Sequence, residues 1–420
     1  MTEQPIKHVQ LIWNDISNIT RTRVVTKKRY DQMVAEKGLS LTSGILSFPL
    51  MYDMLIEDSP AGEVTLLPDQ STLKRLPWLT DTAIVLCDFL TTKSQQLWER
   101  YPRTFLKNKV SELSAYGASV TLGFELEFCV SERGKPLDTT VYAEAKALRG
   151  KGWKVLSTIV ETLEDLGIPV WQYHPESAYG QLEVAIGPFV NEPVKAADSL
   201  VLARHTIYSI CENFGFNATF IPKPFAAQAG NSNHTHISVQ TKDGDSAELT
   251  EQFSAGVLDH LPVLFPLIAP TPNSYARIVP QCWAGAFKFA GYENKEAPIR
   301  LIRNNQSSVG RFEVKTPDGT ASPYFIVGGL LAAGIDGIKR KMVLPKEINV
   351  EPTSLPEEER PDRLPATLEA ATKVFSTSEF MRNQLGDDLF KRVVAIRRFE
   401  DNHFKPFSSE EITEFLRQRY

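Results

Sequence analysis

The sequence predicts an α+β fold in which a small N-terminal domain precedes a larger domain. Segments that read as antiparallel strands are interleaved with helices, which favours α+β over a doubly wound parallel sheet. The 420 residues are enough for two or three domains with a large core. The composition, 42% hydrophobic and 23% charged residues, is typical of a globular protein.

The first part of the chain is predicted to be rich in strands. Residues 8–30 read as two short strands around a turn-like cluster, and residues 50–90 as further strands broken by prolines. Pro102 then predicts the start of an amphipathic helix over 103–117. We therefore expect a boundary near residue 100, with domains at 1–100 and 101–420.

The second part is predicted to alternate strands and helices. Strands are expected at 120–130, 181–187, 234–240 and 309–316. Helices are expected at 151–166, 193–214, 247–260, 322–340, 366–386 and 388–403. Residues 273–303 read as a long loop, and residues 346–366, rich in proline and glutamate, as a surface loop.

Charge and composition exclude several classes of protein. The net charge of −5 leaves no basic footprint for nucleic acid. The four cysteines form no CxxC pair and read as reduced thiols of a cytosolic protein. The N-terminus has no apolar signal-peptide core, and the longest apolar run, 261–271, is short and holds three prolines. We expect a cytoplasmic protein without nucleic-acid or membrane partners.

The strand expected at 120–130 carries two glutamates. Glu125 and Glu127 are two residues apart, so they share one face, while Phe124, Leu126 and Phe128 take the other. Exposed carboxylate pairs are common, which is the simpler interpretation. On so apolar a strand, however, burying the pair requires a positive partner, and a divalent metal ion would serve.

Four further segments gather polar residues on one strand face or in one loop. They are Glu176 and Glu183 around a glycine turn; His234, His236 and Ser238 on one strand; Arg311, Glu313 and Lys315 on another; and Arg277, Lys288, Lys295, Arg300 and Arg303 in one long loop. Taken singly, the histidine pair could lie on the surface and the Arg-Glu-Lys alternation could be a solvated strand face.

Together these segments indicate metal-assisted chemistry. Carboxylate oxygens with one imidazole suit Mg²⁺ or Mn²⁺ rather than structural zinc. Two such metals beside clustered arginines and lysines suit phosphoryl transfer from a nucleotide. The chain has no GxxxxGK[ST] or GxGxxG motif, so a nucleotide would rest on metals and arginines instead of a glycine-rich loop.

In their order, these segments resemble the glutamine synthetase superfamily over nearly the whole chain. The matching pieces are residues 123–128, 176–183, 222–225, 230–238, 273–277, 293–300, 311–318 and the helix that follows Pro323 and Tyr324. The resemblance implies an N-terminal β-grasp domain and a glutamine-synthetase-type catalytic domain with a curved antiparallel sheet. It also implies a homo-oligomeric ring, of ten or twelve subunits, with active sites between neighbours.

The resemblance also implies roles for individual residues. They are Glu127, Glu176 and Glu183 as ligands of one metal; Glu125, His234 and Glu313 as ligands of a second; His236 and Ser238 beside ATP; Arg300 and Arg311 on phosphate, with Lys295 as a third catalytic cation; and Gly230, Arg277 and Lys315 beside glutamate. In the implied reaction, ATP phosphorylates the γ-carboxylate of glutamate and a nitrogen nucleophile then displaces the phosphate.

The chain departs from the family pattern where ammonia would bind. Trp283 stands where glutamine synthetases carry a loop glutamate, and residues 41–52 lack the usual Asp-Gly-Ser-Ser. An indole cannot accept a proton, but it offers an apolar wall or a cation–π face to a bulkier amine. This pattern is similar to the γ-glutamylamine synthetases. Lys295 and Lys315 replace arginines, which leaves a close analogue of glutamate open as the acid.

Three functions follow from these observations. The first is an ATP-dependent ligase that joins glutamate to an organic amine. The second is an ordinary glutamine synthetase, and the third is an inactive assembly protein of the same fold. Among lesser candidates, His174 could orient Glu176, but a core or surface role is expected for it. Surface or ion-pair roles are expected for Glu293 and Glu296, and no nucleophilic role for Cys282.

Overall fold

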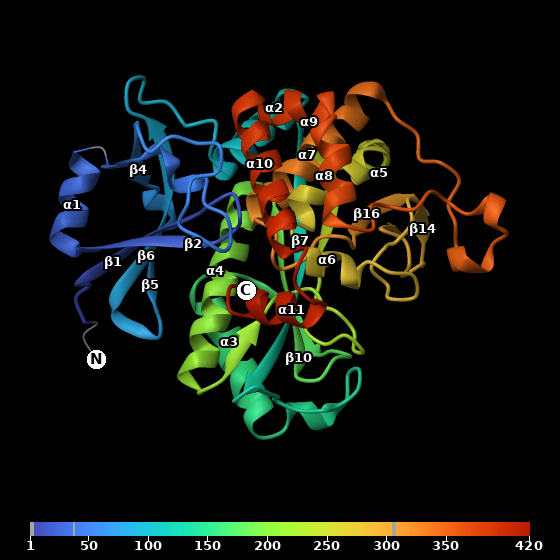
Figure 1. The fold of residues 1–420 in the computed structure, drawn as a ribbon, viewed down its shortest axis with the longest axis horizontal. Helices are drawn as coiled ribbons and strands as arrows, with labels where there is room; N and C mark the ends of the chain where they lie inside the picture. Colours follow the sequence, from blue (N-terminus) through green and yellow to red (C-terminus); the bar gives the residue numbers. More distant parts are fainter. Residues whose placement is uncertain (1–3, 37, 305–307) are drawn as a thin grey trace.

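The computed structural model describes residues 4–36, 38–304 and 308–420. Two sheets organise the chain, and Figure 1 shows the N-terminal sheet at one side of a larger body. The first sheet ends before residue 100 and the helix after it begins at Pro102. The division into domains 1–100 and 101–420 stays a prediction.

The N-terminal sheet has the strand order β2-β1-β6-β4-β3, with β5 also paired to β6. β1 and β6 run parallel, and the other pairs are antiparallel. The helix α1(Lys27–Ala35) was not expected; its Tyr30 and Met33 pack into the core beneath the sheet. The strands are β1(His8–Asn14), β2(Thr20–Thr26), β3(Leu39–Thr42), β4(Glu63–Pro68), β5(Lys74–Leu76) and β6(Leu79–Thr91).

The larger sheet has the order β14-β15-β16-β12-β7-β10-β9, with β8 and β11 on β7 and β13 on β12. Its pairings are antiparallel except between β14 and β15. The strands are β7(Ala118–Glu132), β8(Lys135–Pro136), β9(Val170–Pro175), β10(Gln181–Val190), β11(Asn217–Thr219), β12(Asn233–Thr241), β13(Gly244–Asp245), β14(Ala290–Tyr292), β15(Ile299–Arg303) and β16(Val309–Val314).

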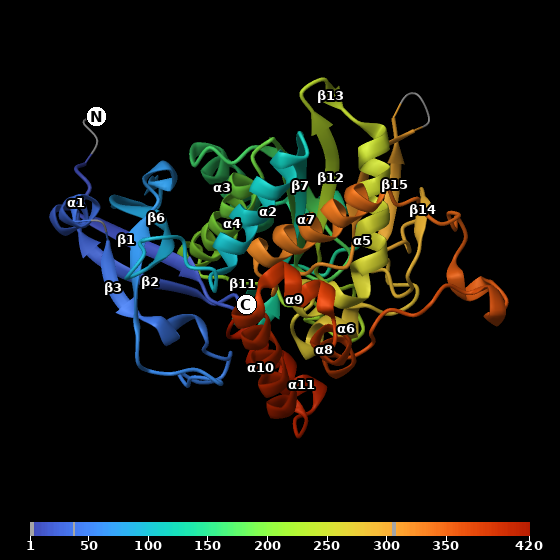
Figure 2. The same cartoon turned by 90° about the horizontal axis from the view of Figure 1, so that it is seen from above.

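Helices cover one face of this sheet, as Figure 2 shows for α2, α4, α5 and α7 beside β7 and β12. Phe124, Leu126 and Phe128 of β7 are buried in the core on that side, as the alternation predicted. The helices are α2(Pro102–Ala115), α3(Lys151–Asp165), α4(Pro193–Asn213), α5(Ala247–Ile268), α6(Pro272–Arg277), α7(Pro323–Arg340), α8(Leu368–Ser376), α9(Glu379–Leu385), α10(Asp387–Phe404) and α11(Ser409–Arg417). In the described ranges, no helix has the length and apolar character that a bilayer crossing needs.

Three expectations about the helices are wrong. α5 does not end at 260 but continues through Pro262 and Pro266 to Ile268. An interior proline costs about 3 kcal/mol, but burial of Leu264, Phe265 and the neighbouring apolar side chains, each worth about 1.5–3 kcal/mol, outweighs it. The helix expected at 366–386 is two helices, because Ser378 caps α9 by accepting from the Met381 N–H. α11 was not expected.

A buried arginine connects the N-terminal sheet to the helices that pack on the larger sheet. Arg103 of α2 is 1% exposed, and its guanidinium bonds Asp88 of β6 at 2.7 Å. It also makes a bidentate hydrogen bond to Asp198 of α4 at 2.7 and 2.9 Å, and donates to Asp69 at 2.8 Å.

Figure 1 shows the proline- and glutamate-rich segment 346–366 extending from the opposite side of the body, as expected for a surface loop.

Candidate active site

Strand pairing brings several of the predicted site residues to one face of the larger sheet. Glu127 of β7 lies opposite Glu183 of β10, which in turn lies opposite His174 of β9. Two residues along β7, Glu125 lies opposite His234 of β12. Directly opposed residues point to the same side of a sheet, so strand pairing gathers these side chains.

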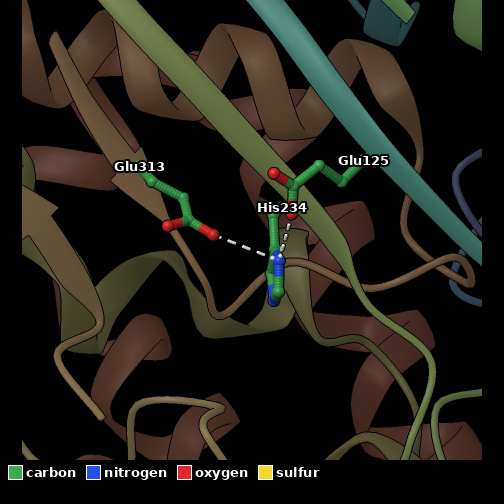
Figure 3. A group of neighbouring side chains, drawn as sticks. All are labelled: Glu125, His234 and Glu313. Atoms are coloured by element: carbon green, nitrogen blue, oxygen red, sulfur yellow. Dashed lines mark hydrogen bonds and ion pairs between the residues drawn. The ribbon is translucent and has the colours of Figure 1, made fainter. Parts of the chain in front are cut away.

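His234 joins two carboxylates at the centre of the site, and Figure 3 shows the three side chains converging. Its Nδ1 atom lies 2.8 Å from Glu125 Oε2 and 3.1 Å from Glu313 Oε1. Potential ligand atoms of the three residues all lie within 4.8 Å of one another. Two cations also contact the buried Glu313: Lys315 Nζ lies 3.2 Å from its Oε1 atom, and the Arg300 N–H donates to Oε2.

A second group of the same kind contains His174, which the sequence analysis ranked only among the lesser candidates. His174 Nε2 lies 3.1 Å from Glu176 Oε1, and His174 Nδ1 lies 3.8 Å from Glu183 Oε1. Their ligand atoms again lie within 4.8 Å of one another. The expected third member, Glu127, lines the same cavity, but its Oε2 atom accepts the Ser232 N–H at 2.8 Å. His174 therefore lies in the cavity wall against Glu176, where it could orient that glutamate, and not in the core or on the open surface.

Two cavities sharing a wall contain nearly all the predicted site residues. The first has a volume of about 250 Å³ and is lined by Glu125, Glu127, Glu176, Glu183, His234, Glu313, Gly230, Arg277, Trp283, Lys295, Arg300 and Lys315. The second, of about 530 Å³, is lined by His236, Ser238 and Arg311. Both cavities include Glu125 and Arg300, so the predicted metal and nucleotide residues meet along one seam.

The carboxylates strongly affect one another. Burial, followed by repulsion from Glu125, Glu127, Glu176 and Glu313, raises the pKa of Glu183 to about 10. Burial also raises the pKa of Glu127. Burial acts to raise the pKa of Glu125 as well, but hydrogen bonds from His234 and His236 outweigh it and hold that pKa well below its usual range. The face therefore concentrates more negative charge than its own cations neutralise.

This donor set fits divalent cations. Glu125, His234 and Glu313 offer two carboxylates and an imidazole, and Glu176 and Glu183 offer two more carboxylates beside His174. Oxygen-rich sets of this kind suit Mg²⁺ or Mn²⁺. A cation between Glu183 and its neighbours would relieve the repulsion that keeps the Glu183 proton in place.

The loop that carries Trp283 is held from behind by a glutamate. The Trp283 side chain is 54% exposed and faces the first cavity, with Lys295 Nζ 4.8 Å from its ring centroid. The buried Glu296 carboxylate accepts the N–H groups of Trp283 at 2.9 Å and Gln281 at 3.2 Å. Gln281 and Trp283 both have positive φ, at 65° and 52°. The surface or ion-pair role expected for Glu296 is therefore wrong.

The predicted glutamate-binding residues lie against one another. The buried Arg277 guanidinium donates to the carbonyls of Lys315 at 3.2 Å and Thr316 at 2.5 Å, which fixes the segment after β16. A Cβ atom on Gly230 would lie 2.6 Å from Arg277 Cγ and 2.4 Å from the Pro222 carbonyl oxygen. Only glycine fits there, so the cavity wall depends on it.

Residues 99–420 match the family model described as glutamine synthetase, catalytic domain. The chain belongs to the glutamine synthetase family. The resemblance predicted from the ordered motifs is thus confirmed, and membership supports an ATP-dependent ligase, since the family typically uses ATP and divalent metals.

Curated relatives of the family differ in the reactions their names describe. The chain is 29% identical to γ-glutamylpolyamine synthetase GlnA3 of Streptomyces coelicolor, covering 100% of this chain and 95% of the relative. It is 31% identical to a glutamine synthetase of Methanocaldococcus jannaschii, covering 90% and 88%. Protein fluG of Emericella nidulans is 29% identical over 99% of this chain, which spans 49% of that longer relative.

Solved structures confirm the glutamine-synthetase-type fold. A crystal structure of a glutamine synthase homologue superimposes with a TM-score of 0.86 at 26% identity, covering 99% of both chains. GmaS in complex with ADP superimposes with a TM-score of 0.86 at 24% identity, covering 97% of this chain and 96% of GmaS. The predicted α+β architecture with a large curved sheet is therefore correct.

Proposed function

We propose that this chain is an ATP-dependent ligase that forms an amide between the γ-carboxylate of glutamate, or a close analogue, and an organic amine. The observation that carries this proposal is Trp283, an exposed indole on the wall of the carboxylate-lined cavity. An indole cannot serve as the proton acceptor that an ammonium ion requires, but it can pack against the carbon atoms of a larger amine.

Two divalent cations, Mg²⁺ or Mn²⁺, would be held by the two groups of site residues. Glu125, His234 and Glu313 would hold one, and Glu176 and Glu183 would hold the other with Glu127 or His174. When bound, such cations neutralise charge on the transferring phosphoryl group. The cationic side chains Arg300, Arg311 and Lys295 would bind phosphate oxygens at the same seam.

The proposed reaction has two steps, phosphorylation of the acid and displacement of the phosphate by the amine. An oxygen of the γ-carboxylate bonds to the terminal phosphorus of ATP, and ADP leaves with the electron pair of the broken P–O bond. The neutral amine then attacks the acyl carbon, the amine loses a proton, and inorganic phosphate leaves with the C–O pair. Gly230, Arg277 and Lys315 would position the acid, and His236 and Ser238 the nucleotide.

A second candidate is an ordinary glutamine synthetase that uses ammonia. It is favoured by the 31% identity to the archaeal glutamine synthetase, slightly above the identity to GlnA3. An inactive assembly protein is disfavoured because all six predicted metal ligands line one cavity. Assembly into a ring of ten or twelve subunits stays a prediction.

The decisive experiment offers ATP, Mg²⁺ and glutamate with a panel of mono-, di- and polyamines and with ammonia. Products are identified by mass spectrometry, and ADP release is measured in parallel. The proposal expects a γ-glutamylamide with at least one organic amine at higher kcat/KM than with ammonia. Turnover with ammonia alone would favour the second candidate, and no turnover with any nitrogen source would favour the inactive protein.

A further inference from the structure

An exposed tryptophan contributes to the wall of the second cavity. Trp171 of β9 is 75% exposed, the highest exposed fraction among the aromatic side chains of the described residues. It lines the cavity that also contains His236, Ser238 and Arg311. Within the described ranges it pairs with no other aromatic ring, whereas the nearby Trp153 packs beside Tyr173 with ring centroids 6.5 Å apart. A large apolar surface is thus left open to a ligand.

A β-bulge brings this side chain to the cavity. Gln172 pairs with Ala185 and Val170 pairs with Ile186, so Trp171 is an extra residue that has no partner on β10. Strict alternation would put it on the same face as Tyr173, away from the site. Bulges redirect side chains and recur next to active sites. The position of Trp171 on the cavity wall is the result of this local irregularity.

Beside Trp171, small residues replace the carboxylates on the site face of the sheet. Moving outward from the carboxylates, β7 changes from Glu125 to Gly123, and β10 changes from Glu183 through Ala185 to Gly187. A Cβ atom built on Gly123 would have no atom closer than 3.6 Å, so glycine leaves real space there. A Cβ atom on Gly187 would meet the Leu122 carbonyl oxygen at 2.9 Å, so the open space lies above Gly123 and Ala185, where an indole at the edge leaves a slot for a planar ring.

The slot lies at a suitable distance from the phosphate-binding residues. Trp171 stands opposite the step between Ala185 and Ile186, two to three residues along β10 from Glu183. At about 3.3 Å per residue, this is about 7–10 Å along the strand. Glu125 and Arg300 lie where the two cavities meet. A nucleotide with its terminal phosphates at that seam would therefore extend its base toward Trp171.

We propose that Trp171 is the stacking platform for the nucleobase of the nucleotide substrate, an inference that rests on the proposed function. The face of an indole stacks on any planar base, and removing such a platform typically costs about 5- to 150-fold in affinity. Triphosphate recognition at the seam would remain unchanged. Trp171 is thus a residue for nucleotide binding, separate from the groups that hold phosphate.

The test compares ATP with inorganic tripolyphosphate, each with Mg²⁺, by calorimetry on the full-length wild type and the variants Trp171→Ala, Trp171→Phe and Trp153→Ala. Trp171→Ala is expected to weaken ATP binding at least about fivefold, while the dissociation constant for tripolyphosphate stays the same. Trp171→Phe should retain most of the ATP affinity, and Trp153→Ala should match the wild type. Quenching of tryptophan fluorescence by ATP should be reduced in both Trp171 variants.

Two outcomes would overturn the inference. Equal ATP affinity in wild type and Trp171→Ala would show that the ring does not contact the base. An equal loss for ATP and tripolyphosphate would show general damage to the site. The proposed function is tested separately by the amine panel, because a glutamine synthetase that uses ammonia would also bind ATP.

Discussion

Glu296→Gln is expected to loosen the loop that presents Trp283 while leaving the metal and nucleotide residues intact. The carboxylate accepts two backbone N–H groups, at 2.9 and 3.2 Å, and both donors belong to residues with positive φ. A glutamine has one acceptor oxygen, and its NH₂ group would face the second N–H as donor against donor. One hydrogen bond to a charged acceptor is therefore lost.

The size of the effect follows from that bond. A hydrogen bond to a charged group contributes about 1.5–3 kcal/mol, and each 1.4 kcal/mol is about a tenfold change in an equilibrium. The ordered loop should lose about 10- to 150-fold in population relative to other conformations. Because Trp283 is proposed to contact only the amine, kcat/KM for the amine should fall about tenfold or more, with ATP affinity unchanged.

The assay is steady-state ADP release with the amine as the varied substrate and with ATP and glutamate saturating. ATP binding is measured by calorimetry on the same preparations. Glu293→Gln is the matched control, since Glu293 lies in the same loop but is exposed. Unchanged amine kinetics in Glu296→Gln, or equal losses in both variants, would refute the assignment of Glu296 as the residue that positions Trp283.

Three further predictions concern the rest of the molecule. Arg103→Met takes away the ion-pair partner of the buried Asp198 carboxylate and leaves Asp88 and Asp69 with Lys107 alone, so it should lower the free energy of unfolding in urea by about 3–5 kcal/mol. Arg29→Met, which breaks an exposed ion pair, should cost less than about 1 kcal/mol, and similar losses would contradict the role of the network. Because the folded pKa of Glu183, about 10, lies above its ordinary value of 4.5, the stability it contributes is complete below about pH 4.5 and is lost as pH rises toward 10. The protein in EDTA should therefore lose thermal stability between about pH 7 and pH 9, more than the protein with Mn²⁺; parallel curves would contradict this. Gly230→Ala should weaken glutamate binding and leave ATP binding unchanged in calorimetry, because the added Cβ meets Pro222 and Arg277; normal glutamate affinity would contradict the tight fit.

The features that the sequence predicted well are those that depend on local periodicity. Alternation over residues 124–128 assigns the two faces of β7 correctly, because successive side chains of any strand point to opposite sides. Once the strands containing Glu183, His234 and Glu313 are recognised, their polar faces can be expected to meet. The structure brings these three residues to one cavity.

The features that could not be predicted from the sequence depend on contacts between residues that lie far apart in the chain. His174 belongs to β9, an edge strand with mostly exposed or half-buried residues, so hydrophobic alternation gives almost no sign of the strand or of its pairing with Glu183. Glu296 is buried only because the loop around Trp283 folds over it. The two prolines in α5 would end a helix on the surface, whereas burial on the core side compensates for them here.

The count of bound metal ions tests the central claim most directly. Wild-type protein with a non-hydrolysable ATP analogue is titrated with Mn²⁺, and bound ions per chain are counted by electron paramagnetic resonance and calorimetry. Two ions are expected, with one lost in Glu125→Gln and the other in Glu183→Gln. A wild type that binds no Mn²⁺, or variants that both keep two ions, would contradict the account of a paired metal site at the junction of the two cavities.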